Sequence, residues 1–360
     1  MPPEASSITG KEKRSAYFDN LRAILIILVL IGHFGGDNTS FGVGGNVFLK
    51  TIECFIYLFH MPLLFFISGV FSKDTEKCRE KAVFDLLVPY LLFQVFYGIV
   101  QYLLKAETVY LHNPFWPAPA LWYLLALFFY RFLLRDLIKI RWNLVLAGLL
   151  SVFSFLLIGL SHDFGMNRAI PYLFYFLLGY HIKASQIVSL RAKLFRKKIG
   201  FATALLLMGL CCAVFAAIYY LLSVELFPFS DFLGLIGHSK SCVDVGIGRS
   251  GGFLFSIALS IATFITSAAL MLLTPQKRCF LSNIGSDTLP LYLSHMLIQL
   301  LYYQVQRRYF FFESWTVNYL LSFLPVALCV AAFSSKGYRK LFHKCLGWFQ
   351  KIIRKAEVSK

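Results

Sequence analysis

The sequence predicts an all-α polytopic membrane protein, a bundle of about ten transmembrane helices with both termini in the cytoplasm. Of the 360 residues, 58% are hydrophobic and 15% are charged, whereas soluble domains average about 45–50% and about 25%. The mean hydropathy of +0.67 agrees with this class. Because one soluble core stops growing at about 250–300 residues, a soluble chain of this composition would expose too much apolar surface. These observations exclude an ordinary soluble enzyme, a disordered chain and a secreted disulfide scaffold.

The predicted spans are apolar segments, because a membrane-spanning helix needs roughly 20 mostly apolar residues. The first segment is clear from Leu21 to Phe34, and the segment over 169–182 is the shortest. The segments lie near 20–36, 52–72, 82–104, 120–138, 142–160, 169–182, 199–223, 252–274, 284–304 and 317–334. An even number of spans places both termini on the same side of the membrane.

The distribution of Lys and Arg predicts the orientation. With a cytoplasmic N-terminus, 28 of the 35 Lys and Arg residues fall in inside segments and 7 in outside segments. This asymmetry follows the positive-inside rule, and it explains most of the formal net charge of +17 without a nucleic-acid partner. We expect a cytoplasmic arm over 1–19, a transmembrane domain over 20–334 and a basic amphipathic tail over 335–360 on the anionic inner leaflet. The expected location is the plasma membrane.

The first span carries ionisable residues that are costly in lipid and therefore point to function. Arg22 and His33 are eleven residues apart, so on a helix they share one face, separated by roughly 16 Å along the axis. Asp19 lies one turn before Arg22 and can pair with it. Arg22 alone could be an interfacial cation whose charged end reaches the headgroups. His33 is harder to explain without a function.

Three later segments place polar residues within spans. His60 precedes Pro62, which breaks helical hydrogen bonding. Trp122 fits either a pocket or an outer aromatic belt. Tyr292 and His295 lie one helical turn apart on one face. A proton relay, a metal pair or a general base could each use two buried histidines, but no carboxylate or histidine stands at ligand spacing from either His33 or His295, so we expect no metal.

Five segments together resemble a known family. FDNLRAILIILVLIGHF carries the R-x10-H pattern of the acyltransferase-3 superfamily of integral-membrane acyltransferases. The other four segments, which resemble the fucose 4-O-acetylase-like subgroup, are FHMPLLFFISGV, LLVPYLLF, ALWYLLALFFYR and IGSDTLPLYLSH. They occur in the family's order from residue 18 to about residue 296, most of the chain.

This resemblance implies a bundle of about ten transmembrane helices that transfers an acyl group, usually acetyl from acetyl-CoA, to a hydroxyl of a sugar or another cell-surface acceptor. It implies that His33 is the catalytic histidine and that Arg22 helps to hold the acyl donor. It also makes His60, Trp122, Tyr292 and His295 candidate pocket residues. No cofactor is expected to stay bound, because acetyl-CoA is a substrate.

One position departs from the family pattern. Members usually carry a basic residue just before the LLVPY segment, where this chain has Asp85. Arg79 and Lys81, a turn or more earlier, are the cations that could help Arg22 to bind the phosphates of CoA at the inner face.

The chemistry needs a base, because a sugar hydroxyl is a poor nucleophile at neutral pH and a neutral imidazole can accept its proton. Direct transfer with His33 as general base is the expected mechanism, and a transient acetyl-histidine is the alternative. The acceptor is expected to be a carbohydrate or glycolipid. The outside loop 224–251 has residues that suit a sugar or, alternatively, an interfacial loop: Phe227, Phe229, Asp231, Phe232, His238 and Asp244.

Two other classes stay open at this stage. A proton-coupled membrane transporter would also use midplane histidines and proline-broken helices, although no paired halves with matching interruptions are visible. A non-catalytic scaffold would leave His33 unexplained. Binding of acetyl-CoA discriminates the enzyme from both.

Overall fold

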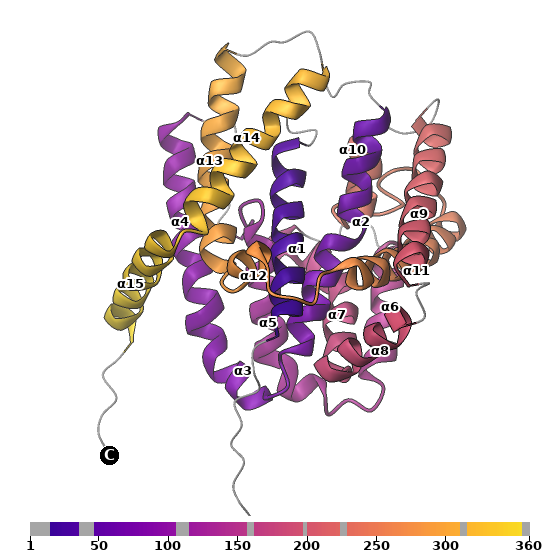
Figure 1. Cartoon of the computed structure of the whole chain (residues 1–360), viewed down its shortest axis with the longest axis horizontal. Helices are drawn as coiled ribbons and strands as arrows, with labels where there is room; N and C mark the ends of the chain where they lie inside the picture. The colour runs from indigo at the N-terminus through magenta and orange to yellow at the C-terminus, as the bar shows by residue number, and fades with distance from the viewer. Residues whose placement is uncertain are drawn as a thin grey trace, which may run out of the picture.

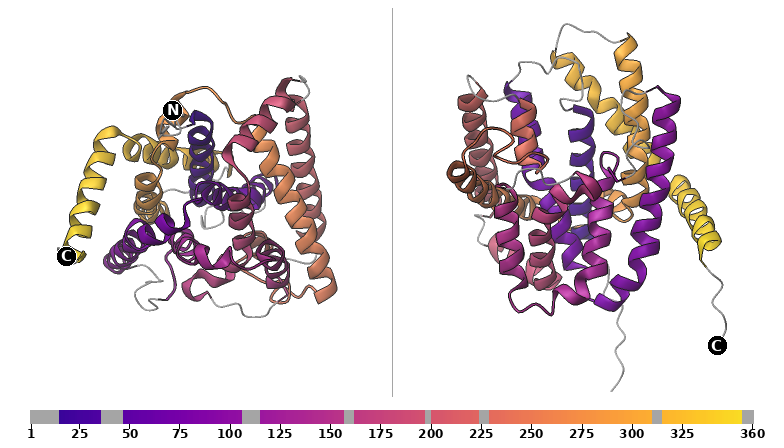
Figure 2. Two further views of the ribbon diagram at one scale, coloured as in Figure 1. Left: turned by 90° about the horizontal axis from the view of Figure 1, so that it is seen from below. Right: turned by 180° about the vertical axis from the view of Figure 1, so that it is seen from behind.

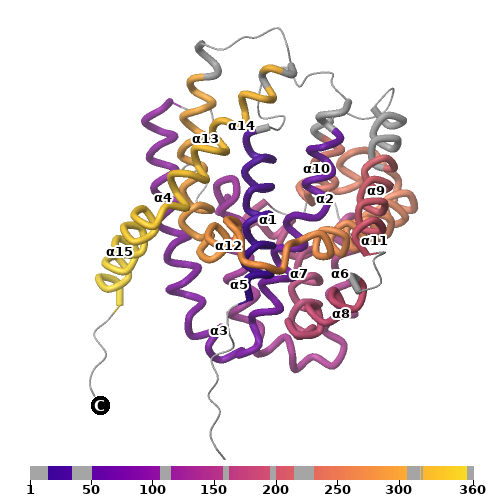
Figure 3. Tube along the Cα trace, in the orientation of Figure 1, coloured from indigo at the N-terminus to yellow at the C-terminus, as the bar shows by residue number. Residues whose placement is uncertain are grey.

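The computed structural model describes residues 15–35, 47–105, 115–156, 162–196, 200–223, 229–309 and 315–354 (coloured in Figure 1). Figure 3 shows the Cα trace in the same orientation. Every regular element within these ranges is a helix, which confirms the all-α class. A helix lies in each of the predicted spans: α1 (Ala16–Gly35), α2 (Val47–Val70), α4 (Val88–Leu103), α5 (Leu121–Leu137), α6 (Asn143–Ser154), α7 (Met166–His181), α9 (Gly200–Ser223), α11 (Arg249–Leu273), α13 (Leu289–Tyr309) and α14 (Trp315–Phe333).

The number of membrane crossings stays a prediction. Within the described ranges, length and composition alone identify 4 helices that can cross a membrane, or up to 5 when the bent pair α14 and α15 (Lys336–Ile353) is one span. α5 and α7 have 17 and 16 residues, fewer than the roughly 20 that a perpendicular span needs. Short helices of this kind can still belong to a membrane bundle when other helices surround them.

Five helices fall outside the predicted spans: α3 (Thr75–Ala82), α8 (Ala184–Arg196), α10 (Phe229–Ile236), α12 (Phe280–Gly285) and α15. A π-helical turn, η1 (Val83–Leu87), joins α3 to α4. α8 is the amphipathic part of the predicted inside loop 183–198. α10 occupies part of the predicted outside loop, whose residue Phe227 lies outside the described residues.

Helix α1 lies in the centre of the bundle (Figure 1). At the end of α1 that begins at Ala16, Asn20 Nδ2 donates to the carbonyl oxygens of Pro275 and Lys277, both at 2.9 Å. Ser282 Oγ donates to Asn20 Oδ1 at 2.6 Å. These bonds fix the start of α1 against the segment that leads into α12, so the first predicted site segment has a defined position.

Glycines allow two close helix crossings. A Cβ atom at Gly69 of α2 would lie 1.9 Å from the carbonyl oxygen of Phe176 of α7, and one at Gly179 of α7 would lie 2.0 Å from the carbonyl oxygen of Phe66 of α2. Small residues at helix interfaces let backbones approach in this way. The reciprocal pair locks α2 onto α7, and these two helices carry His60 and part of the cavity described below.

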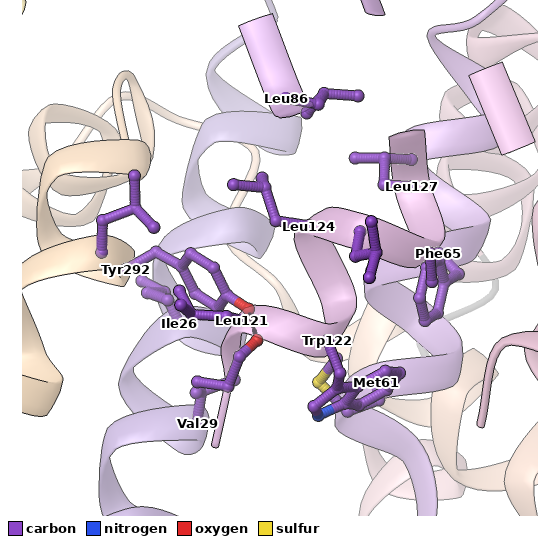
Figure 4. Close-up of a cluster of buried hydrophobic side chains, with 14 of the residues drawn as sticks. Ile26, Val29, Met61, Phe65, Leu86, Leu121, Trp122, Leu124, Leu127 and Tyr292 are labelled. Atoms are coloured by element: carbon purple, nitrogen blue, oxygen red, sulfur yellow. Dashed lines mark hydrogen bonds between the residues drawn. The ribbon is translucent and has the colours of Figure 1, made fainter. Parts of the chain in front are cut away.

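The segment before α5 folds back into the bundle. Gln94 of α4 donates through Nε2 to the carbonyl oxygen of Trp116 at 2.7 Å, and its Oε1 accepts from the amide of Ala118 at 2.8 Å. Ala120 follows with a positive φ of 70°. α5 therefore starts among buried side chains, and Trp122 is only 8% exposed, so it lies in the interior and not in an outer belt. Figure 4 shows Trp122 beside Met61.

The C-terminal helix α15 projects from the edge of the bundle (Figure 2) and makes an angle of 69° with α14. Its inward face contacts the protein: His343 Nε2 lies 2.6 Å from Asp287 Oδ2, and Gln350 Nε2 donates to the carbonyl oxygen of Phe84 at 2.6 Å. Its other face exposes Leu341 and Trp348. The position of this helix at the inner leaflet stays a prediction, and the packing of its inward face was not predicted.

Candidate active site

Two histidines from distant parts of the chain meet in the bundle. His33 stands in the last turn of α1, and His295 lies on α13. Their ring centroids are 5.3 Å apart. Tyr292, one turn before His295, has its ring centroid 6.0 Å from the imidazole of His295. The structure therefore brings the first and the last predicted site segments together.

Hydrogen bonds assign the tautomer of two histidines. His295 Nδ1 lies 2.6 Å from the carbonyl oxygen of Tyr292, and because a carbonyl only accepts, Nδ1 carries the proton. Nε2 of neutral His295 then holds a lone pair, and it is buried with no hydrogen-bond partner among the described residues. His60 Nδ1 donates in the same way to the carbonyl oxygen of Ile56 at 2.6 Å. Each imidazole thus presents an Nε2 that can accept a proton.

Side chains of α13 also hold the backbone of His33. Gln299 Nε2 and the hydroxyl of Tyr303 donate to the carbonyl oxygen of His33 at 2.9 and 2.8 Å. Carbonyls in the last turn of a helix lack intrahelical partners, so these two donors satisfy one of them. The same contacts set the distance between α1 and α13 at the height of the histidine pair. Sequence analysis did not single out either residue.

A cavity of 470 Å³, here called the outer cavity, opens beside His33. His60, Trp122 and Tyr292 line it together with His33, so four of the predicted site residues share one space. Other lining residues that carry polar groups are Glu53, Tyr57, Trp116, His162, Asn167, Arg168, Tyr172 and Ser239. The size and the mixture of aromatic and polar groups suit a small polar molecule such as a sugar unit.

Arg168 is the cation of the outer cavity that sequence analysis missed. Its guanidinium carbon lies 5.1 Å from the ring centroid of Trp122, and Trp122 stacks on Tyr172 with centroids 5.6 Å apart. Arg168 stands at the start of an apolar segment, where the charge distribution alone makes it an outside-loop residue. Its position directly before the shortest predicted span, in what is the first turn of α7, was the available sign that it faces the interior.

A second cavity of 460 Å³, here called the inner cavity, lies on the other side of Tyr292. Tyr292 lines both cavities, and its hydroxyl donates to the carbonyl oxygen of Ala120. Figure 4 shows its ring beside Ile26 and Leu121. The polar residues that line the inner cavity are Asp85, Tyr123, Arg131, Thr288, Tyr292, His343 and Gln350. Tyr292 is thus the shared wall between the two spaces.

Arg131 supplies the positive charge of the inner cavity on the side of α5. Its Nε is buried and has no hydrogen-bond partner within the described ranges. A guanidinium in that state needs an acceptor, and phosphate oxygens provide one. Asp85, which departs from the family pattern, lines the same cavity. Arg131 is therefore the Lys or Arg residue that lines this cavity among the described residues.

The cations that sequence analysis assigned to the donor make other contacts. Arg22 pairs with Asp19 at 3.4 Å, as predicted, and its guanidinium carbon lies 4.5 Å from the ring centroid of Phe71. Arg79 pairs with Asp136 at 3.2 Å. Lys81 is exposed on α3. None of these three cations is among the residues that line the inner or the outer cavity.

The described part of the outside loop is held by its own polar groups. Asp231 pairs with Lys240, and Asp244 Oδ2 accepts from the amide of Ser241 at 2.9 Å. Burial lowers the pKa of His238 to about 3, so this histidine is neutral, with its ring 4.8 Å from that of Tyr172. Gly234, Gly237 and Ser239 of this loop line the outer cavity instead.

Comparisons with known proteins identify the family of the chain. A family model described as an acyltransferase domain matches residues 15–334. The nodulation protein NolL of Sinorhizobium fredii (strain NBRC 101917 / NGR234) is 35% identical over 102 residues, which is 26% of this chain and 27% of NolL. The chain thus spans about a quarter of that relative. No solved structure matches significantly. Because the family model covers nearly the whole chain, the protein belongs to the acyltransferase-3 superfamily.

Proposed function

We propose that the protein transfers an acetyl group from acetyl-CoA to a hydroxyl of a sugar in a cell-surface or lipid-linked glycan at the plasma membrane. The observation that carries this proposal is the pair of cavities on either side of Tyr292, with the His33–His295 pair beside the outer one. Two substrates that approach from opposite sides of a membrane need such an arrangement. The resemblance of four segments to the fucose 4-O-acetylase-like subgroup supports acetyl as the acyl group.

The inner cavity is the proposed donor site. CoA is made in the cytosol and carries several phosphates, and Arg131 offers N–H donors on the side of the bundle where α15 packs. Passage of the pantetheine arm toward His33 requires the hydroxyl of Tyr292 to leave the carbonyl of Ala120. Arg22, Asp19, Arg79 and Lys81 stay candidates for contacts with the part of CoA outside the cavity. No metal and no bound cofactor is needed, because a thioester is already activated.

The proposed reaction is direct transfer. The acceptor hydroxyl gives its proton to a nitrogen of His33 while its oxygen bonds to the acetyl carbon. The bond between that carbon and sulfur then breaks, and CoA leaves as a thiol with the proton from His33. His295 Nε2 offers a second lone pair next to His33, so it can stabilise the imidazolium by hydrogen bonding. His60 on α2 and His162 also line the same cavity as His33.

The outer cavity is the proposed acceptor site. Trp122 and Tyr172 provide ring faces for the apolar side of a sugar, while Glu53, Asn167 and Ser239 provide hydrogen-bonding groups. His33 faces the same space, so a hydroxyl bound there lies within reach of the base. The acceptor therefore comes from the side of the membrane where α1 ends.

The direct test uses detergent-purified protein and acetyl-CoA labelled in the acetyl group. We expect binding, slow release of free CoA, and loss of that release in His33→Ala with binding retained. His181→Gln is the control, because this histidine lies at the end of α7 and bonds Asn143 outside both cavities. Acetyl label that stays on the wild-type protein without acceptor, is absent from His33→Ala and is released by neutral hydroxylamine would support the acetyl-histidine alternative over direct transfer. Wild-type release of CoA by His33→Ala would contradict both mechanisms.

A further inference from the structure

We propose that the inward face of α15 is part of the binding site for the nucleotide end of CoA. This inference rests on the proposed acetyl-CoA donor and adds to it a segment beyond the acyltransferase family match, which ends at residue 334. The residues of α15 that line the inner cavity are His343, Leu346, Gly347 and Gln350. Their spacing of three, one and three residues describes one stripe along two helical turns.

The stripe is anchored at both ends by side chains. His343 Nε2 lies 2.6 Å from Asp287 Oδ2, in the segment just before α13. Gln350 Nε2 donates to the carbonyl oxygen of Phe84 in η1 at 2.6 Å. Nearer the start of the helix, Arg339 bonds the hydroxyl of Ser286 at 3.0 Å. These contacts hold α15 across the elements that form the rest of the cavity, so α15 is a wall of the cavity and not only a membrane anchor.

The chemistry of α15 suits a polyphosphate. The helix contains five Lys and Arg residues and no Asp or Glu. Arg131 faces the cavity from α5 with a buried Nε that has no hydrogen-bond partner in the described parts of the chain. The Lys and Arg residues of α15 are not among the described residues that line the cavity, so the cation at its wall is Arg131, and α15 adds the imidazole of His343 and the amide of Gln350. A nucleotide with several phosphates would meet hydrogen-bonding groups on both sides of the inner cavity, with the basic helix α15 nearby. An acyl-pantetheine lacks those phosphates and would gain little from α15.

Gly347 leaves open space where that nucleotide would lie. A Cβ atom at Gly347 would meet no protein atom within 4 Å, although the residue lines the inner cavity. A larger side chain at this position therefore fills the cavity without displacing the protein. Gly337, near the start of the same helix, also has no atom within 4 Å of an added Cβ and does not line the cavity. The two glycines form a matched pair for a test.

The experiment compares acetyl-CoA with S-acetyl-pantetheine as donors for full-length protein, wild type beside Gly347→Leu and Gly337→Leu. We expect Gly347→Leu to raise the KM for acetyl-CoA by about tenfold or more, because the larger side chain occupies space that the nucleotide needs. The KM for S-acetyl-pantetheine should change little, and Gly337→Leu should match wild type with both donors. His343→Ala should also raise the KM for acetyl-CoA relative to the KM for S-acetyl-pantetheine.

Two results would overturn the proposal. Equal KM changes for both donors in Gly347→Leu would mean that α15 acts only on the fold or the membrane attachment. Unchanged KM values for acetyl-CoA in both Gly347→Leu and His343→Ala would place the nucleotide elsewhere. If the proposed acetyl transfer itself is wrong, the result is distinguishable from these two, because wild-type protein would then use neither acetyl-CoA nor S-acetyl-pantetheine.

Discussion

His33 and His295 are separated by 262 positions in the chain, yet their rings lie 5.3 Å apart between α1 and α13. The protonated Nδ1 of His295 bonds the carbonyl of Tyr292, which turns the unprotonated Nε2 into the interior beside His33. A hydrogen bond to a backbone carbonyl commonly sets which imidazole nitrogen is basic. The pair is therefore the best candidate for the group that removes a proton from the acceptor.

Removal of either imidazole should reduce acetyl transfer. Positioned general bases contribute about 10²–10⁴-fold, so we expect His33→Ala to lower kcat within that range. His295→Ala should lower kcat less, because His295 acts on His33. The double variant should be no slower than His33→Ala alone, since groups that act as a unit are not additive. A double variant that loses the product of the two single effects would show that the histidines act independently.

Gln299 and Tyr303 should act as positioning residues for His33. Their donors share the carbonyl oxygen of His33, so Tyr303→Phe with Gln299→Leu should lower kcat by roughly 10-fold through loss of alignment. The KM for acetyl-CoA should stay within about twofold, because the inner cavity is untouched. Gln304→Leu is the control, since this neighbouring amide bonds the carbonyl of Leu104 instead. An equal loss in Gln304→Leu would indicate a general effect on α13.

Arg131 should contribute to donor binding and Arg135 should not. Arg131 lines the inner cavity, whereas Arg135, one turn later on α5, pairs with Glu76 at 3.1 Å on the surface. Arg131→Gln should raise the KM for acetyl-CoA about 10-fold or more, the usual loss for a charged hydrogen bond. Arg135→Gln should stay near wild type, because exposed ion pairs are worth at most about 1 kcal/mol. Steady-state kinetics with varied acetyl-CoA gives the KM of each variant. A larger rise in KM for Arg135→Gln than for Arg131→Gln would contradict the inner cavity as the donor site.

The glycine crossing of α2 and α7 should be intolerant of side chains. Gly69→Val would bring a Cβ against the carbonyl of Phe176 at 1.9 Å, and overpacking typically costs about 1–3 kcal/mol, more where backbone must move. We expect loss of the monodisperse peak in detergent size-exclusion chromatography. Gly209→Ala on α9 is the control, because an added Cβ there meets no atom within 4 Å. A stable, active Gly69→Val protein would show that α2 and α7 do not cross this closely.

Much of the helical plan was predictable from the sequence, because apolar segments of span length are a local property. A helix lies in every predicted span, and the pairing of Asp19 with Arg22 follows from their spacing of three residues. The hydrophobic pattern could not show that the segment before α5 folds back into the bundle. That fold depends on the hydrogen bond from Gln94 of α4 to Trp116, which joins a helix to a turn. For this reason an outer-belt position for Trp122 stayed open until its 8% exposure was known.

Several residues that line the outer cavity could be predicted from the sequence, but the presence of two cavities that share Tyr292 could not. His33, His60, Trp122 and Tyr292 share the outer cavity, and their segments were chosen because polar groups in lipid are costly. In the sequence, Arg131 and Arg168 count only as charges that flank predicted spans. Their assignment to one side of the membrane does not show whether their side chains face a cavity. The wall formed by α15 depends on tertiary contacts such as His343 with Asp287, which join distant segments. Catalytic roles for all these residues stay predictions.

The central claim is that acetyl-CoA binds in the inner cavity and reacts at His33. The most direct measurement is isothermal titration of acetyl-CoA into wild-type protein, Arg131→Gln and His33→Ala, followed by the rate at which each sample releases free CoA. We predict that Arg131→Gln weakens binding and that His33→Ala binds like wild type but releases CoA at least about 10²-fold more slowly. No binding to wild-type protein at millimolar acetyl-CoA, or a wild-type rate in His33→Ala, would contradict it.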